Sequence, residues 1–374
     1  MDTLTINTAE IDRRLNNFYY SNPTIDLSYI EKISSSTGIF QHASFNIPNY
    51  HHGYCIDDNC RALLLLMMAQ KQENLGIEHP LFSSYLSFIF YAQNEDGSFK
   101  NFMSYDLRFL EDKGSEDSQG RTIWSLGYLL GNESFDHYWP VARGIFDRGI
   151  DQLLELKSAR AISYALLGLL HYQERYPEDQ HVLNLIQSLT KFLEVEFQMC
   201  ATDEWPWFEE IISYDNAMIP LALFRAGKQL NNQELLIIAE KSFHFLDSIL
   251  FRGDHLSLIG NENWLKKNGE VCTYGQQPIE IPGILWLYQE VYNIDPNPLY
   301  IDRIKRSFLW YLGLNDQRMS LFNAQDNSCY DGLESYGVNK NQGAESNISF
   351  WMSYLLIKEM IFKEGLISRM QTDI

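Results

Sequence analysis

Asp57-Asp58-Asn59-Cys60-Arg61 stands directly before the strongly apolar residues 62–69, and this arrangement decides the fold. A polar cluster followed by an apolar run of helical character occurs six times in the 374 residues. The other five clusters are Ser118-Gln119-Gly120-Arg121, Ser158-Ala159-Arg160, Tyr214-Asp215-Asn216, Gln276-Gln277-Pro278-Ile279-Glu280 and Asn341-Gln342-Gly343-Ala344-Glu345-Ser346. Six buried helices whose polar starts converge on one mouth would form a site for a polar ligand.

Two kinds of helical segment alternate along the chain. The first kind is apolar on nearly every side, which predicts helices that are buried all round. These segments are residues 62–69, 123–130, 162–171, 217–226, 281–291 and 348–357. The second kind is amphipathic, with apolar side chains at spacings of three and four, which is typical of helices that cover a core from outside. These segments are residues 26–36, 79–93, 137–156, 179–199, 233–251 and 297–314.

The sixfold alternation of outer and inner helix predicts an all-α fold, the (α/α)6 toroid or six-hairpin double-walled barrel. Connections from an inner to the next outer helix are short, as at residues 175–178, whereas those from outer to inner are long, as at residues 252–276. Long loops in a compact domain are usually functional. We therefore expect the site on the face where the inner helices begin. No linker interrupts the pattern, which predicts one domain over residues 1–374 with its core at about 24–361.

Charge and composition narrow the classes of partner. The formal net charge is -20 and the pI is about 4.8, so the chain should repel nucleic acid and anionic membranes and favour a neutral or cationic ligand. No apolar run approaches the roughly 20 residues that span a bilayer, and the start lacks a basic segment followed by an apolar one. We expect a cytoplasmic protein with no membrane partner. The five cysteines lack metal-site spacing, which predicts free thiols, no metal and no cofactor.

The six hairpins, with acidic and aromatic residues in the loops before the inner helices, resemble the (α/α)6-barrel, or six-hairpin, glycosidase superfamily over roughly residues 24–361. Some segments are similar to bacterial proteins often associated with sugar-transferring or polysaccharide-utilising enzymes, namely residues 57–62, 119–121, 205–209 with 214–217, and 341–346. The resemblance implies an oligosaccharide or glycoside as substrate, and it suggests association with a glycosyltransferase.

The predicted reaction depends on carboxylates. Cleaving a glycosidic bond needs one carboxylic acid to protonate the leaving oxygen and a second carboxylate to activate water or attack the anomeric carbon. We expect Asp58 with Glu209 or Asp215 as this catalytic pair, and Glu345 as the next candidate. Helix capping is an equally simple explanation for Asp58 and Asp215, and Glu345 could merely stabilise the first turn of its helix.

Aromatic and polar side chains at the same mouth are the predicted substrate contacts. Aromatic faces stack on the C–H faces of sugar rings, although the same rings could instead plug the mouth as ordinary core. The aromatic candidates are Trp205, Trp207, Phe208, Tyr214, Trp264 and Tyr274. Arg61 and Arg121 either orient the carboxylates or bind an anionic sugar, and the first role is favoured. The other predicted contacts are Asp57, Asn59, Gln119, Asn216, Gln277, Glu280 and Gln342.

The sequence thus predicts a carbohydrate-active enzyme, with a two-carboxylate glycoside hydrolase favoured. One alternative is a sugar epimerase of the N-acylglucosamine 2-epimerase type, which uses histidines as proton shuttles and for which His51-His52 is the one suggestive pair. Another is a non-catalytic glycan-binding subunit, because polar clusters bind as readily as they catalyse. A terpenoid-cyclase-like barrel is disfavoured, since its QxxxGxW/F-type repeat occurs only once, at residues 93–99.

Overall fold

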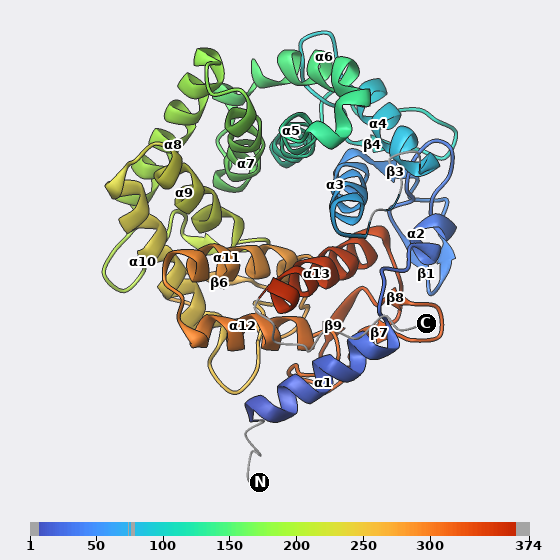
Figure 1. Cartoon of the computed structure of the whole chain (residues 1–374), viewed down its shortest axis with the longest axis vertical. Coiled ribbons are helices and arrows are strands. Elements are labelled where there is room, and N and C mark those ends of the chain that lie inside the picture. Colours follow the sequence, from blue (N-terminus) through green and yellow to red (C-terminus); the bar gives the residue numbers. More distant parts are fainter. Residues whose placement is uncertain (1–6, 74, 76–78, 364–374) are drawn as a thin grey trace.

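The computed structural model describes residues 7–73, 75 and 79–363. Helices that surround the centre of the molecule dominate it (Figure 1). The inner helices are α3 (Ile56–Glu73), α5 (Glu116–Leu130), α7 (Ala159–Arg175), α9 (Met218–Gln229), α11 (Glu280–Ile294) and α13 (Ala344–Lys363). Each inner helix contacts the next in chain order, and α13 contacts α3, so the inner helices close a ring. The six apolar segments predicted as inner helices fall within them to within one residue.

Close backbone approach joins two of the inner helices, α5 and α7. A Cβ atom on Gly120 would lie 2.2 Å from the carbonyl oxygen of Ala161, and one on Gly127 would lie 2.1 Å from that of Gly168. Only glycine fits at such distances. Side-chain caps fix where the two helices start, because Ser115 accepts a hydrogen bond from the Ser118 N–H and Ser158 accepts one from the Ala161 N–H.

Five outer helices pack outside this ring and match five of the predicted amphipathic segments. They are α4 (Pro80–Ala92), α6 (Trp139–Ile150), α8 (Gln180–Cys200), α10 (Gln233–Leu250) and α12 (Pro298–Leu309). Two short 3-10 helices, η1 (Glu133–Tyr138) and η2 (Leu153–Glu155), flank α6. Among the residues that the structure describes, no helix has the length and apolar character that crossing a bilayer requires.

The first outer helix differs from the prediction. Residues 26–36 contain only the five-residue α2 (Ser28–Lys32), while α1 (Thr8–Ser21) packs on α12 along the outside of the molecule (Figure 1). Ile11 and Leu15 of α1 are buried in the core, and the Tyr19 hydroxyl donates to the Tyr354 carbonyl at 3.0 Å. The core therefore begins before the expected residue 24. The apolar stripe of α1 gives a weak signal in the sequence because charged and amide residues surround it.

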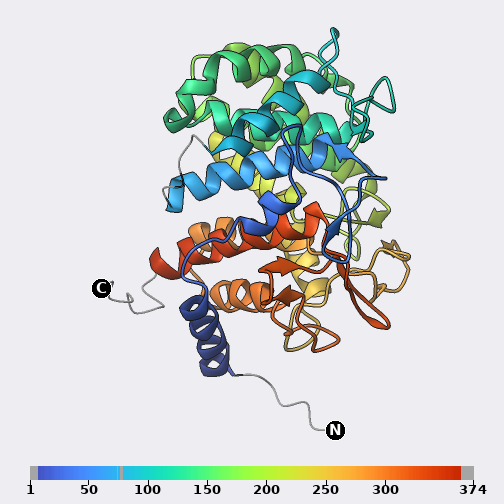
Figure 2. The same ribbon diagram turned by 90° about the vertical axis from the view of Figure 1, so that its right-hand side faces the viewer.

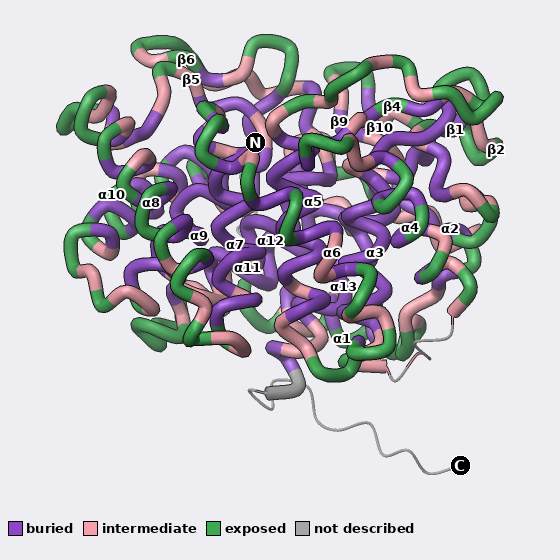
Figure 3. Tube along the Cα trace, turned by 90° about the horizontal axis from the view of Figure 1, so that it is seen from above, coloured by how far each residue is buried: buried purple, intermediate pink, exposed green. Residues whose placement is uncertain are grey.

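The long connections lie together on the face where the inner helices begin (Figures 2 and 3). In the described chain they contain short antiparallel pairs of strands, each a separate two-stranded sheet. The pairs are β1 (Ala43–Ser44) with β2 (Ile47–Pro48), β3 (Tyr54–Cys55) with β4 (Phe102–Met103), β5 (Ile211–Ile212) with β6 (Leu265–Lys266), β7 (Phe322–Asn323) with β8 (Ser328–Cys329), and β9 (Gly332–Glu334) with β10 (Gly337–Asn339). The predicted position of the long loops is confirmed.

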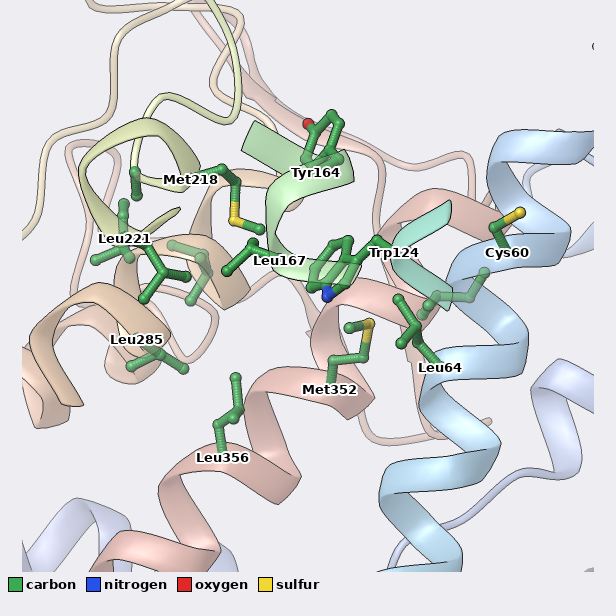
Figure 4. Packing of buried hydrophobic residues seen from close by; sticks show 14 of the residues in the cluster. Cys60, Leu64, Trp124, Tyr164, Leu167, Met218, Leu221, Leu285, Met352 and Leu356 are labelled. Carbon is green, nitrogen blue, oxygen red and sulfur yellow. The ribbon is translucent and has the colours of Figure 1, made fainter. Parts of the chain in front are cut away.

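Apolar side chains from the inner helices meet inside the ring (Figure 4). Leu64 of α3, Trp124 of α5, Leu167 of α7 and Met352 of α13 are all buried there. The Trp124 ring stacks on the Tyr164 ring, with centroids 5.8 Å apart and an interplanar angle of 8°. The middle of the ring is therefore packed core, and open cavities lie toward its two ends.

Candidate active site

A polar cavity of about 540 Å³ opens on the loop face, above the beginnings of the inner helices. The predicted site residues that line it are Asp57, Asp58, Arg61, Arg121, Tyr214, Trp264, Gln277 and Glu345. They come from inner helices α3, α5 and α13 and from the long connections. Side chains from parts of the chain almost 300 residues apart thus meet at the predicted face.

Asp58 and Glu345 are held by the same guanidinium. Arg61 donates from Nη1 to Asp58 Oδ1 at 2.8 Å, and its Nη2 lies 3.0 Å from Glu345 Oε2. The Asp58 side chain is 7% exposed, whereas that of Glu345 is 35% exposed. Burial raises the pKa of Asp58 to about 6, with the charge of Arg61 opposing this rise and that of Glu345 adding to it. The cavity therefore contains one buried carboxyl that keeps its proton to a higher pH than an ordinary aspartate, beside another carboxyl that is more exposed to solvent.

A second arginine links Asp57 to Asp215. Arg121 Nη1 donates to Asp57 Oδ1 at 3.3 Å, and Nη2 donates to the Tyr164 hydroxyl at 2.8 Å. Tyr164 in turn donates to Asp215 Oδ2 at 2.6 Å. Burial raises the pKa of Asp215, and the charge of Arg121 opposes this effect. Asp215 lies below the open cavity, where it borders a narrow space of about 20 Å³.

Glu280 holds the turn that presents Asp215. The Asp215 residue has a left-handed φ of 50°, and its N–H donates to Glu280 Oε1 at 2.7 Å. Glu280 is buried, and this burial, followed by the nearby charge of Asp215, raises the pKa of Glu280 to about 8. Glu280 thus acts on the backbone of the Asp215 turn and does not line the open cavity.

Glu280→Gln should make stability less sensitive to pH. Because the folded-state pKa is raised from 4.5 to about 8, the stabilising contribution of the Glu280 proton is complete below pH 4.5 and is lost as pH rises through about 8. Glutamine keeps an oxygen that can accept from Asp215 N–H but does not titrate. Wild type should lose stability between pH 5 and pH 9, whereas the variant should not lose it through this group. The unfolding free energy of the variant minus that of wild type should therefore rise by on the order of 3 kcal/mol from pH 5 to pH 9. Urea denaturation at both pH values measures this gain, and an equal difference between variant and wild type at the two pH values would contradict it.

Glu209 lies away from the Asp58 and Glu345 pair. Its Oε2 is 3.8 Å from Arg160 Nη1 and makes no hydrogen bond to any described residue, and its burial raises its pKa. Arg160 also approaches Asp117, which accepts a hydrogen bond from Tyr214. Glu209 therefore belongs to a neighbouring charged cluster behind Tyr214, and of the predicted partners for Asp58 the structure brings Glu345 closest.

The aromatic loop before Glu209 is buried, in contrast to the predicted sugar subsite. Trp207 is 0% exposed, Trp205 packs edge-on against Phe245 of α10, and Phe208 packs against Phe197 of α8. Burial of large rings gives this loop its stability. The structure thus favours the alternative in which Trp205, Trp207 and Phe208 are core.

Several other predicted contacts support loops without lining the cavity. The Asn59 amide donates to the Cys55 carbonyl at 2.7 Å, and the Gln119 amide donates to the Gly149 carbonyl at 2.8 Å. Asn216 exchanges hydrogen bonds with the backbone of Ser213. Gln342 is buried, and Tyr274 is half-buried, outside the cavity lining.

Asp331 is a cavity residue that the sequence analysis missed. Its Oδ1 accepts from the Gly343 N–H at 2.6 Å and from the Ser346 hydroxyl at 2.9 Å, and burial raises its pKa. The Asp331 N–H donates to the carbonyls of Asn339 and Asn341, which brings this loop position beside the start of α13. Asp331 does not adjoin an inner helix in the sequence, so no local signal marked it. Gln41, His42, Cys55, Phe102, Asn261 and Glu334 also line the cavity and were not predicted.

No family model and no curated protein matches the chain. Solved structures do match it. The cellobiose 2-epimerase from Spirochaeta thermophila DSM 6192 has a TM-score of 0.71 at 11% identity, over 98% of this chain and 100% of that one. The cellobiose 2-epimerase from Bacillus thermoamylovorans B4167 has a TM-score of 0.68 at 10% identity, covering 92% and 99%. A GH76 α-mannanase from Bacteroides thetaiotaomicron has a TM-score of 0.62 at 11% identity, covering 94% and 97%.

These neighbours all belong to the (α/α)6-barrel glycosidase-like superfamily, and the chain shares their fold. Both sugar epimerases and glycoside hydrolases are among them. At such low identity the likeness establishes the fold, and the activity must be argued from the site.

Proposed function

We propose that this protein is a carbohydrate-active enzyme, a glycoside hydrolase that uses Asp58 and Glu345 at the mouth of a single-domain (α/α)6 toroid. The observation that carries the proposal is the Asp58–Arg61–Glu345 arrangement at the cavity. Glycoside hydrolysis requires two carboxyl groups in different protonation states on either side of the scissile bond. Different burial of the two side chains supports such a difference.

The environments of the two carboxyls suggest their roles. Asp58 would deliver its proton to the leaving oxygen, because burial keeps that proton bound at higher pH than in an ordinary aspartate. Glu345, which is more open to the cavity, would activate water or attack the anomeric carbon. Arg61 would fix both side chains before substrate binds, and the Cys55 thiol, which donates to Asp58 Oδ2 at 3.1 Å, would add to this.

The charge of the cavity favours a neutral or cationic sugar. Five acidic side chains line the cavity, whereas its two arginines are each already paired with an acid. A uronate or a phosphate would meet net negative charge there. The volume of about 540 Å³ lies within the range of roughly 300–1,000 Å³ typical of ligand pockets, which suits an oligosaccharide segment or a glycoside.

Trp264→Ala is expected to weaken oligosaccharide binding about tenfold. Trp264 and Tyr214 both line the cavity, with ring centroids 6.1 Å apart, and the half-buried Trp264 ring can stack on a sugar face. Calorimetric titration of oligosaccharides into an Asp58→Asn background, which blocks turnover, measures this loss. Unchanged affinity would remove Trp264 from the proposed subsite.

A sugar epimerase is the second candidate, and a histidine pair supports it. His42 lines the cavity, and its ring lies 4.6 Å from that of His52, one of the two residues singled out in the sequence. Epimerisation that proceeds by proton transfer at a sugar carbon would exchange that proton with solvent.

One pair of assays separates these functions. Aryl glycosides and natural oligosaccharides are screened for released sugar, and the same sugars are followed by NMR in D₂O for deuterium uptake at carbon. Sugar release that disappears in Asp58→Asn supports the hydrolase. Deuterium uptake that disappears in His42→Ala or His52→Ala would overturn it in favour of the epimerase. Binding without turnover, unaffected by Asp58→Asn and Glu345→Gln, would leave a non-catalytic glycan-binding protein.

A further inference from the structure

A second cavity, of about 260 Å³, lies at the opposite end of the ring, where the inner helices end. All six inner helices contribute to its lining. The rings of Trp124 and Trp286 meet edge to face there, with centroids 5.2 Å apart at 67°. The same two tryptophans border the narrow space beside Asp215, so they separate this cavity from the candidate active site.

Polar groups without partners face this second cavity. Trp124 is only 6% exposed, yet its indole N–H donates to none of the described residues. Figure 4 shows the Trp124 nitrogen on the side of the ring away from Tyr164, toward Met352. The Tyr128 hydroxyl and the His171 ring nitrogens likewise make no hydrogen bond within the described part of the chain. Because these three residues line the cavity, their polar groups can hydrogen-bond to a ligand that enters it.

The charges around the cavity favour an uncharged ligand. Burial, followed by the charges of Arg225 and Lys71, lowers the pKa of His171 to about 3, so the imidazole is neutral at physiological pH and offers one donor and one acceptor. Lys71 and Arg225 line the cavity together with Glu359, and the ends of the inner helices add partial negative charge. Neither a full anion nor a full cation is strongly preferred.

The shape favours one saturated ring. The cavity is smaller than the roughly 300 Å³ at which sites for drug-sized ligands begin. Because Trp124 and Trp286 meet at 67°, they do not form a parallel slot for a flat aromatic ligand. A pyranose can place its C–H face on one indole while its hydroxyls, which both donate and accept, reach the Trp124 nitrogen, Tyr128, His171 and the amide of Asn293.

We infer that the cavity at the C-terminal ends of the inner helices is a binding site for a single neutral monosaccharide unit, separate from the candidate active site. The inference concerns binding alone and does not depend on the proposed hydrolysis.

Saturation-transfer NMR on the full chain tests this site with D-glucose, D-mannose, D-galactose and N-acetylglucosamine, each at millimolar concentration. Tyr128→Phe and Asn293→Ala remove one polar group each, from the second cavity only. Asn293 is exposed at the end of α11, so its replacement should leave the fold intact, which circular dichroism checks. Trp264→Ala is the matched control, because it changes only the candidate active site.

At least one neutral sugar should bind Trp264→Ala as it binds wild type, and its dissociation constant should rise about tenfold in Tyr128→Phe and in Asn293→Ala. Three results would overturn the inference. The first is that none of these sugars binds Trp264→Ala, and the second is that binding is unchanged in both second-cavity variants. The third is that glucuronate or glucosamine binds this cavity at least tenfold more tightly than glucose, which would show a charged ligand class.

Discussion

Asp58→Asn is expected to lower kcat/KM for glycoside hydrolysis by roughly 10²- to 10⁴-fold, because an amide keeps the shape of the carboxyl but cannot deliver a proton. In wild type, kcat/KM should fall as pH rises through about 6, where the Asp58 carboxyl loses the proton that the reaction needs. This limb of the pH profile should be absent in the variant. Steady-state rates between pH 4 and pH 9 measure both effects.

The stability of Asp58→Asn and a control variant at another aspartate show whether a loss of activity comes from the chemistry of Asp58. The folded-state pKa of Asp58 is raised from 3.8 to about 6, so its proton stabilises the fold fully below pH 3.8, and that contribution is lost as pH rises through about 6. Asparagine removes this titration but also removes the buried ion pair with Arg61, so urea denaturation of the variant at pH 7 must show that it is still folded. Asp203→Asn, an exposed replacement of the same kind on the loop face, should leave kcat/KM unchanged. Equal activity of Asp58→Asn and Asp203→Asn would contradict the assigned role.

Trp207→Ala is expected to lower the free energy of unfolding by about 3 to 5 kcal/mol, the range found when large buried aromatic side chains are truncated. The Trp207 ring is fully buried and packs against Phe208 and Phe245, so its removal leaves a cavity between the loop and outer helix α10. Urea denaturation measures the loss. Trp264→Ala provides the comparison, since its half-buried ring should contribute to sugar affinity more than to stability.

The two tryptophan variants together decide between packing and binding. If Trp207→Ala weakened sugar binding and left the unfolding free energy unchanged, the loop would be the subsite that the sequence predicted. If it unfolds the protein at lower urea and leaves affinity unchanged, burial alone explains why three large rings stand beside Glu209.

The helices were predictable because their signal is local. A helix that is buried all round, such as residues 162–171, carries apolar residues at every position, and this pattern does not depend on what packs against it. Loop length then indicated the face of the site. The helix α1 was missed because its stripe of Ile11, Leu15 and Phe18 lies among charged and amide residues, and only the contact with α12 shows that it belongs to the core.

The site was less predictable because its residues meet through tertiary contacts. The sequence predicted that Arg61 orients carboxylates, and its pair with Asp58 lies three residues away on the same helix, but no local pattern joins Arg61 to Glu345. Aromatic residues in a loop look alike in sequence whether they face a ligand or a neighbouring helix. Trp207 and Trp264 differ only in the surfaces that the fold places against them.

The short sheets of the loop face have a consequence for how this surface moves and changes. Two of the five pairs join strands from different connections: β3 precedes α3 and joins β4 from the next connection, while β5 and β6 join the connections before α9 and α11. Backbone hydrogen bonds between Gln276 and Leu333, and from Ala344 N–H to the Gln41 carbonyl, carry this linkage on to the last connection and back to the first. Backbone hydrogen bonds thus link the connections before α9, α11, α13, α3 and α5 into one belt along the rim of the cavity. Its amides should exchange with solvent as one cooperative unit, and a loop grafted from another barrel would have to match the hydrogen bonds of both its neighbours.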